Sequence, residues 1–179
     1  MQVNLGKNIT LSVLPFTLAD TPVLFSYLQQ LSAITRSRFA PHGFESADIL
    51  TAYASPCALF GYLGFLNNKE LIAYTVVKIG YLQQDAPRLQ SYGLSLHPLT
   101  DAAVAPSVAD AWQGRGAGGA MMQAVIHDLK PKGINRLLLW GGVQTTNEKA
   151  VGFYKRMGFW EAGSFEYNGS NTDMVMELQ

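Results

Sequence analysis

The chain has 179 residues, of which 48% are apolar and 15% are charged, a composition typical of a globular protein rather than a disordered one. Its 13 basic and 13 acidic residues cancel, which argues against a broad nucleic-acid surface, because such a surface needs a basic excess. A single cysteine, Cys57, excludes an internal disulfide framework, and its apolar surroundings favour a buried structural thiol over a nucleophile.

The sequence shows neither an apolar run of about 18 residues, as a membrane helix requires, nor the apolar stretch of a signal peptide near its start. We therefore expect a cytoplasmic protein that does not bind membranes. No linker, internal repeat or shift in composition divides the chain, so we expect one domain over residues 1–179.

The first half of the chain predicts one strand, two helices and a hairpin. Asp20 and Pro22 are typical of a helix start, and Ser46 is a candidate N-cap for the second helix. The expected elements are a strand at 9–14, a helix at 22–32, a loop at 36–44, a helix at 45–54, and two strands at 57–66 and 71–80 that the polar turn 67–70 joins.

The second half begins with residues 81–101, which hold two prolines and no clear period, and which we interpret as irregular with a short strand near 94–96. Pro106 suggests a bulge or an unpaired edge position in the strand that follows. The remaining elements are a strand at 102–110, a helix that Pro131 and Gly133 end, a strand at 136–140, a helix around 150–157, and a hairpin of 159–167 and 172–178 around Asn168-Gly169. The order predicts a mixed α/β fold.

The stretch DAWQGRGAGGAMM, residues 110–122, places four glycines at the start of a helix, although each glycine inside a helix costs about 1 kcal/mol relative to alanine. Glycines let backbone amides converge on one point, and the first amides of a helix lack internal partners. Such an arrangement binds anions, most often phosphate. The alternative is a flexible turn.

The spacing of Gly114, Gly116 and Gly119 also fits the dinucleotide fingerprint G-x-G-x-x-G. That fingerprint requires an acidic residue about 20 positions later, and residues 135–143 contain none. A Walker loop is excluded as well, because no Gly-Lys-Ser/Thr follows. The phosphate group therefore belongs to another class of ligand.

Two motifs carry a family resemblance. Residues Gln113–Gly118 match the pattern Q/R-x-x-G-x-G/A, and NEKAVGFYKRMGF at 147–159 matches N-x-x-A-x-x-F/L-Y-x-x-x-G-F. Over about 102–178 the chain resembles the GNAT superfamily of acyl-CoA-dependent N-acyltransferases. The resemblance implies a mixed, mostly antiparallel central sheet flanked by helices, with the strands at 102–110 and 136–140 splayed apart.

The resemblance also implies how acetyl-CoA binds, with no metal involved. The pantetheine arm would pair with the backbone of Val108, Ala109 and Asp110, and Asn147 would contact it or the loop beside it. An N–H near Val108 or Ala109 would stabilise the oxyanion, and Arg115 would add charge at the ADP end. The pyrophosphate would sit on the amides of Gln113, Gly114, Arg115, Gly116, Ala117, Gly118 and Gly119.

Tyr154 occupies the position of the family's general acid, and a phenol is protonated at neutral pH. Periodicity alone would favour a core aromatic there. No base can be named, because residues 102–109 contain neither a carboxylate nor a histidine. His42, His97 and Asp101 are candidates only if their segments fold over the site, and a water relay is an alternative. Asp110 suits turn capping better, and we expect His127 on a solvated helix face.

The acceptor pocket should come from residues 34–55, residues 81–101 and the final hairpin. Arg36 and Arg38 could hold a carboxylate or phosphate of the acceptor, or belong to an ordinary solvated loop. Four aromatic residues could line an apolar cavity, although single aromatics are more often core: Phe39, Phe44, Tyr92 and Trp140.

The sequence thus predicts an acetyl-CoA-dependent N-acetyltransferase that acts on a primary amine of a small molecule or a protein, as a monomer or homodimer. Three alternatives stay open: a catalytically silent acyl-CoA sensor, a nucleotide-binding oxidoreductase and an interaction module.

Overall fold

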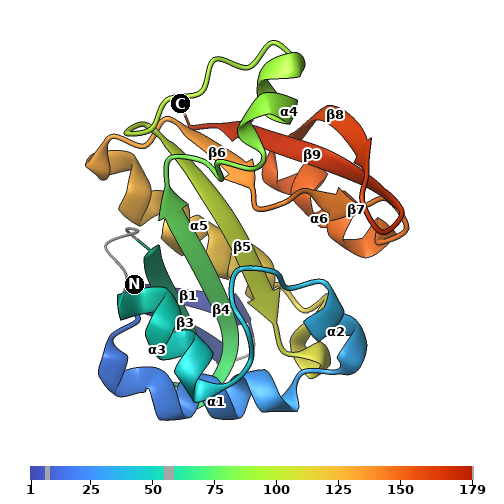
Figure 1. Ribbon diagram of the computed structural model, residues 1–179. Coiled ribbons are helices and arrows are strands. Elements are labelled where there is room, and N and C mark those ends of the chain that lie inside the picture. Colours follow the sequence, from blue (N-terminus) through green and yellow to red (C-terminus); the bar gives the residue numbers. More distant parts are fainter. Residues whose placement is uncertain (7–8, 55–58, 179) are drawn as a thin grey trace. The chain divides into compact units, whose positions relative to one another are not determined.

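The computed structural model describes residues 1–6, 9–54 and 59–178 (Figure 1). The chain forms two compact units: the first comprises Met1–Val77 and Ala105–Asp128, and the second comprises Lys78–Val104 and Leu129–Gln179. No helix within the described residues is both long and apolar enough to cross a membrane. The expectation of one domain stays a prediction.

The strands form one sheet with the hydrogen-bonded order β1-β2-β3-β4-β5-β6-β9-β7, and β8 pairs with β9. β5 and β6 are parallel, whereas β1–β2, β2–β3, β6–β9, β7–β9 and β8–β9 are antiparallel. This is the predicted mixed, mostly antiparallel sheet. The strands of the described residues are β1 Gln2–Gly6, β2 Ile9–Pro15, β3 Leu59–Leu66, β4 Glu70–Ile79, β5 Asp101–Val108, β6 Arg136–Leu139, β7 Val143–Gln144, β8 Trp160–Glu166 and β9 Ser170–Glu177.

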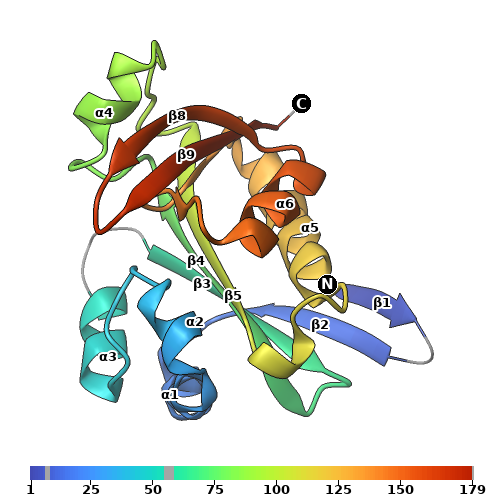
Figure 2. The same ribbon diagram turned by 90° about the vertical axis from the view of Figure 1, so that its right-hand side faces the viewer.

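In the first unit, helices cover both faces of the sheet (Figure 2). Two glycines of β3 allow this close packing. A Cβ on Gly64 would lie 3.3 Å from Met121 Sδ of α5, whereas a Cβ on Gly61 would lie 2.7 Å from the Tyr53 hydroxyl of α3. The helices here are η1 Leu18–Asp20, α1 Thr21–Gln30, α2 Ala33–Ser37, α3 Ser46–Ala54, η2 Asp110–Trp112 and α5 Ala117–Leu129, whose last residue belongs to the second unit.

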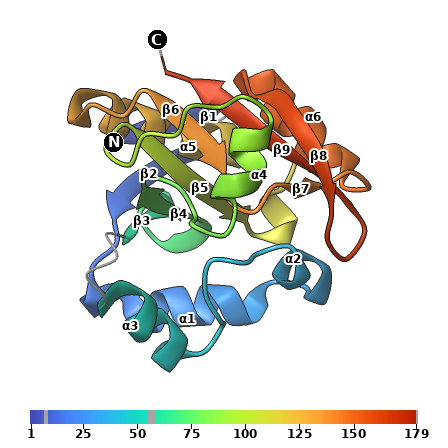
Figure 3. The same ribbon diagram turned by 45° about the horizontal axis from the view of Figure 1, so that its top comes forward.

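In the second unit, α4 (Ala86–Ser91) and α6 (Glu148–Met157) lie on opposite sides of the β8–β9 hairpin, and η3 spans Lys130–Lys132 (Figures 2 and 3). Leu89 of α4 is buried against Leu138 and Val175 of the sheet. The Tyr92 ring fits where Gly163 lacks a side chain, since a Cβ there would lie 2.3 Å from the ring. Within residues 81–101, α4 was not predicted and packs on the hairpin, whereas residues 81–85 and 92–100 form neither helix nor strand, as the irregular interpretation expected.

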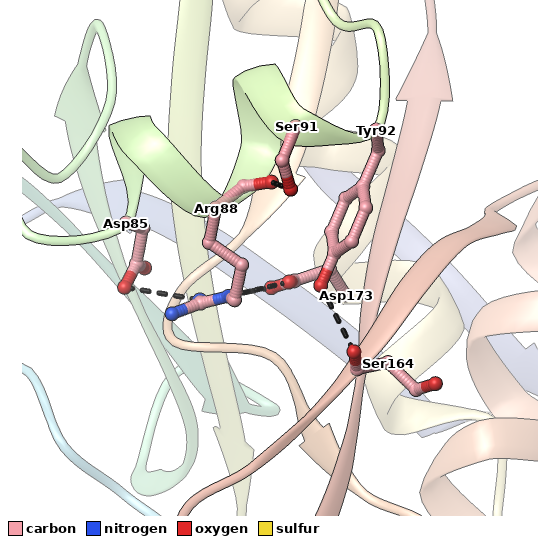
Figure 4. Close-up of polar contacts among 6 residues, drawn as sticks. All are labelled: Asp85, Arg88, Ser91, Tyr92, Ser164 and Asp173. Atoms are coloured by element: carbon pink, nitrogen blue, oxygen red, sulfur yellow. Dashed lines mark hydrogen bonds and ion pairs between the residues drawn. The ribbon is translucent and has the colours of Figure 1, made fainter.

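An ionic cluster ties α4 to β9 (Figure 4). The Arg88 guanidinium donates from Nε to Asp173 Oδ2 at 2.7 Å and from Nη2 to Asp173 Oδ1 at 3.1 Å. Its Nη2 also lies 3.0 Å from Asp85 Oδ1. Burial raises the pKa of Asp85, although Arg88 opposes that shift. The Tyr92 hydroxyl donates to the backbone oxygen of Ser164, so both ends of this segment are fixed to the hairpin.

Several local predictions were wrong. Residues 94–96 form no strand, and the expected loop at 36–44 begins inside α2. Ser46 is the first residue of α3 rather than its N-cap. Asp20 makes no side-chain cap to α1, because its carboxylate accepts from Thr17 N and Oγ1, both at 2.8 Å. β1 and β7 were not predicted, and Cys57 lies outside the described residues.

Candidate functional site

The glycine loop before α5 adopts a backbone that other residues rarely take. Gly114 has φ of +73° and Gly116 has φ of +87°, both in the left-handed region. A Cβ on either glycine would meet no atom within 4 Å. These glycines are therefore required for the backbone conformation and not to make room for a neighbouring group.

The first amides of α5 are not used within the helix; Gly118 and Gly119 are partly exposed, whereas Ala117 is fully buried. Ala120 N donates to Gly116 O at 3.0 Å, but within the described residues the amides of Ala117, Gly118 and Gly119 have no backbone acceptor. The loop before them is exposed. Free amides and the positive end of a thirteen-residue helix dipole together favour an anion at this point.

The two polar side chains of the loop lie at its edges. Gln113 donates from Nε2 to Val108 O at 3.2 Å and to Thr35 Oγ1 at 3.3 Å. The exposed Arg115 lies with its Cζ 5.5 Å from the ring centre of Trp112. The Gln113 side chain thus supports the end of β5 and α2, and Arg115 is left free to meet a charged group.

The end of β5 has one edge occupied and one edge open. Ala109 N donates to Ile72 O at 2.8 Å, and Gly80 N donates to Asp101 O at 2.7 Å, which places β4 and β5 in one continuous antiparallel register. Because amides alternate in direction along a strand, the Val108 N–H points away from β4. Of the two expected oxyanion donors, the Ala109 N–H is thus already engaged, and the Val108 N–H is the better candidate.

The parallel ladder between β5 and β6 stops before that end. It joins Asp101–Val104 to Arg136–Leu139 in four pairs, and no pair is recorded for Ala105–Val108 among the described residues. This agrees with the predicted splay. Pro106, which has no N–H, takes a position on the edge away from β4, as expected for an unpaired position, and the register shows no bulge against β4.

The Asp110 carboxylate is fully engaged with α2. Its Oδ2 accepts from Ser32 N at 2.9 Å, and its Oδ1 accepts from Ser32 Oγ and Thr35 Oγ1, both at 2.7 Å. Partial burial raises the pKa of Asp110, but these hydrogen bonds outweigh it and the net pKa is lowered. Asp110 is therefore an ionised structural acceptor, as expected, although its partners lie in α2 rather than in its own turn.

Asn147 and Tyr154 bracket the first two turns of α6 in the second unit. Asn147 is the N-cap of this helix, and its side chain accepts from Ala150 N at 3.4 Å. Tyr154 is buried with its ring centre 5.5 Å from that of Phe159. Burial raises the pKa of Tyr154, so its hydroxyl stays protonated, and that hydroxyl has no hydrogen-bond partner among the described residues. The Tyr154 hydroxyl can therefore donate a proton, but it is not ionised to a phenolate that could accept one.

The three candidate bases have different surroundings. Asp101 is buried and paired with Arg136, whose Nε lies 3.0 Å from Asp101 Oδ1, and it also accepts from His97 N, so it is committed. His42 belongs to a chain of side chains: its Nε2 lies 2.8 Å from the Tyr74 hydroxyl, which lies 2.6 Å from the Tyr53 hydroxyl. The side chain of His97, the third candidate, is exposed, and His127, which was not a candidate, is exposed as expected.

The direction of the bonds around His42 follows from its other nitrogen. Nδ1 lies 2.6 Å from Gly43 O, which can only accept, so Nδ1 carries the proton and Nε2 is left to accept from Tyr74. Burial lowers the pKa of His42, against the raising effects of Gly43 O and Asp48. The imidazole is thus neutral at pH 7 and oriented as a proton acceptor.

Of the residues expected to line an acceptor pocket, Phe39 is buried in the core and most of the others are half-buried with partners of their own. Phe39 is buried, with its ring centre 5.8 Å from that of Tyr74, and Tyr92 packs on the hairpin. Arg36 donates to Gln29 O at 2.7 Å, whereas Arg38 is exposed and has no partner within the described residues. Phe44 receives the Arg36 guanidinium at 5.4 Å, and Trp140 is half-buried. Only Arg38 is thus left free to bind a ligand.

The family model of the acetyltransferase (GNAT) family matches residues 28–159. The chain belongs to this family. The match spans α2, the glycine loop and the Asn147–Phe159 motif. No curated protein sequence matches the chain.

Solved GNAT structures share the fold. The GNAT domain of S. lividans PAT is 24% identical, with a TM-score of 0.72 and coverage of 94% of this chain and 91% of that one. The ribosomal-protein-S18-alanine N-acetyltransferase from Escherichia coli is 16% identical, with a TM-score of 0.66 and 94% of each chain covered. AAC(6')-Ib, solved with ribostamycin and coenzyme A, is 19% identical, with a TM-score of 0.68 and 93% of each chain covered.

The described residues contain no group of three or more His, Cys, Asp or Glu side chains placed to hold a metal ion. Sequence reasoning missed Ser32, Thr35 and Tyr74. Ser32 could have been found as an N-cap, because serine before a short helical stretch is typical of that position. Nothing local in the sequence indicates that Tyr74 meets His42.

Proposed function

We propose that this GNAT protein is an N-acetyltransferase that transfers the acetyl group of acetyl-CoA to a primary amine. The observation that carries the proposal is the glycine loop, where two left-handed glycines precede amides of α5 that have no backbone acceptor in the part of the chain that the structure describes. A pyrophosphate is the part of an acyl-CoA that such a loop can hold, through backbone groups and without a metal.

In the proposed acetyl transfer, Val108 of the first unit and Tyr154 of the second unit each supply a hydrogen-bond or proton donor. The amine nitrogen attacks the thioester carbon, and the Val108 N–H stabilises the negative charge that develops on the oxygen. The carbon–sulfur bond then breaks, and the Tyr154 hydroxyl gives its proton to the departing thiolate. The nitrogen, which carries an extra proton after attack, releases it to solvent, so that an amide and a thiol result, and Tyr154 regains its proton from solvent.

The amine must also lose a proton, because a primary amine is mostly protonated at neutral pH. We assign this role to the chain that ends at His42. The register places Tyr74 opposite Ser107, one residue from Val108. The amine proton passes along this chain, through the fully buried Tyr74 hydroxyl, to His42 Nε2. The phenols stay neutral, and the imidazolium that forms at His42 returns its proton to solvent.

The acceptor belongs to one of two classes, and the solved relatives suggest a representative of each. AAC(6')-Ib was solved with an aminoglycoside, ribostamycin, and another relative is a ribosomal-protein-S18-alanine N-acetyltransferase. We propose an amine of a small molecule or of a protein, with Arg38 available to an acidic group of the acceptor.

Thermal shift and thiol release test the proposal together. Acetyl-CoA and CoA should raise the melting temperature, whereas NAD should not, because only a ligand that binds the native state adds stability. Acetyl-CoA with ribostamycin, with an alanine-terminated peptide and with a panel of simple amines should release free thiol. A shift without thiol release from any amine would favour a silent acyl-CoA sensor, and no shift at all would refute acyl-CoA binding.

A further inference from the structure

α2 gains little stability from its own five residues. It has five residues, Ala33–Ser37, and none of them is buried. Ile34, its one large apolar residue, is 64% exposed. Helices this short are not stable in water without support, and a helix without buried side chains gains little from packing. The flanking residues Leu31 and Phe39 are buried and Arg36 donates to Gln29 O, so these contacts hold the chain on either side, and polar contacts fix the first turn of α2 itself.

The contacts at its first turn come from the glycine loop, almost eighty residues later in the chain. Asp110 accepts one hydrogen bond from the backbone of Ser32 and two from the hydroxyls of Ser32 and Thr35. Gln113 adds a longer bond to Thr35 Oγ1. We call this set of four residues the α2 strap. All four belong to the first unit.

The strap begins where the loop that we assign to the pyrophosphate begins. Asp110 opens η2, and Gln113 follows it directly before Gly114. A ligand that fixes the backbone of residues 114–119 also fixes Asp110, because only three residues separate them. We propose that Asp110 is a positioning residue that transmits binding of acyl-CoA to α2, so that α2 becomes ordered when the donor is bound. This inference rests on the proposed function of the loop.

The charge of Asp110 gives the coupling a recognisable signature. The ionised Asp110 carboxylate repels a pyrophosphate bound at the neighbouring loop. The hydrogen bonds from Ser32 and Thr35 keep this carboxylate in place and ionised. Asp110→Asn should therefore leave the affinity for CoA unchanged or raise it by a few-fold at most, while α2 loses its order. A variant that merely unfolded the loop would lose CoA affinity instead.

Hydrogen–deuterium exchange followed by mass spectrometry tests the coupling with CoA alone, so that no acceptor has to be known. In the unmodified protein, saturating CoA should slow exchange in peptides covering residues 113–120 and also in those covering 31–38, the latter by about tenfold, as is typical of coupling between sites. In Asp110→Asn, CoA should still protect 113–120 but change exchange of 31–38 by less than twofold.

Asp20→Asn is the matched control. Asp20 also accepts two hydrogen bonds from a residue before a helix, Thr17, but it has no contact with the glycine loop. It should lose a similar amount of stability and keep the response of residues 31–38 to CoA. Thr35→Val removes the two strap bonds of the Thr35 hydroxyl, to Asp110 and from Gln113, and keeps the volume. It should weaken that response partly, and it serves if Asp110→Asn does not fold.

The outcomes separate this inference from the proposed function. Protection of 113–120 without any change at 31–38 would overturn the coupling while leaving acyl-CoA binding intact, and so would an equal response of 31–38 in Asp110→Asn. No protection of either segment would overturn both. For an amine that releases thiol, Asp110→Asn should raise KM for the amine by about tenfold with little change in KM for acetyl-CoA.

Discussion

Replacing Arg88 by methionine should destabilise the protein far more than the loss of an ordinary surface charge. The Arg88 side chain is 23% exposed, whereas that of its partner Asp173 is only 3% exposed. Removing the arginine leaves a buried carboxylate without its cation and without two short hydrogen bonds. Methionine keeps apolar contact with the Phe165 ring, above which the guanidinium now lies at 3.7 Å, so the loss is mainly electrostatic.

The magnitude follows from the burial of Asp173. Breaking a buried ion pair by removing one partner costs about 3–5 kcal/mol, and the partial exposure of Arg88 favours the lower end. A loss of about 3 kcal/mol in a chain of this length lowers the melting temperature by about 6–12 °C. Lys155→Met is the control in the same unit: Lys155 and Glu161 are 56% and 48% exposed, so this change should cost under about 1 kcal/mol.

The stability lost in Arg88→Met should depend on pH. Burial raises the pKa of Asp85, and Arg88 now opposes that rise. In Arg88→Met the pKa of Asp85 should therefore rise further, so the folded state binds more protons than the unfolded one as pH falls. The stability of the variant then rises, relative to the unmodified protein, between pH 7 and pH 4. Urea unfolding at several pH values measures the difference in free energy of unfolding between the variant and the unmodified protein. A difference below about 1 kcal/mol at pH 7, or one that does not become smaller as the pH falls, would refute the stabilising role of Arg88.

Three further predictions concern the proposed reaction. Tyr154→Phe should lower kcat by about a hundredfold or more and leave the Kd for CoA within twofold; an unchanged kcat would exclude Tyr154 as the acid. Gly116→Ala should weaken CoA binding by about 5- to 30-fold in calorimetry, because a left-handed alanine costs about 1–2 kcal/mol, and equal affinity would contradict the role of its φ of +87°. His42 has a lowered pKa and must be neutral to accept a proton, so kcat/KM should fall in acid only at pH values below the ordinary histidine pKa of about 6.5. His42→Gln should be slower and lack this acid limb. An acid limb that persists in His42→Gln would assign it to another group.

The parts of the fold that could be predicted are those where sequence and local structure agree. The closing hairpin was found because Asn168 and Gly169 both take the positive φ that a tight turn needs. The glycine loop was found for the same reason, since its function depends on backbone conformation. Helix α5 has a clear apolar face, with Met122 and Val125 fully buried.

The parts that were missed depend on contacts between distant residues. α4 has one buried side chain, Leu89, and is held by the ion pair to Asp173, which is 85 residues away from Arg88. No periodic pattern can report such support. β1 has no buried residue and is defined only by its pairing with β2. The donors to Asp110 could not be predicted either, because Ser32 lies 78 residues before it.

Residues 110–119 use the backbone for anion binding and side chains for support of α2, two roles that one side chain could not fill together. Their anion-binding groups are amides of the backbone, whose direction is set by φ at Gly114 and Gly116. Their polar side chains, Asp110 and Gln113, instead bind α2 and the end of β5. A carboxylate aimed at the pyrophosphate would oppose binding, so its engagement with Ser32 and Thr35 serves both roles. Changes to the glycines should therefore alter affinity for the donor, and changes to Asp110 the order of α2, each largely without the other.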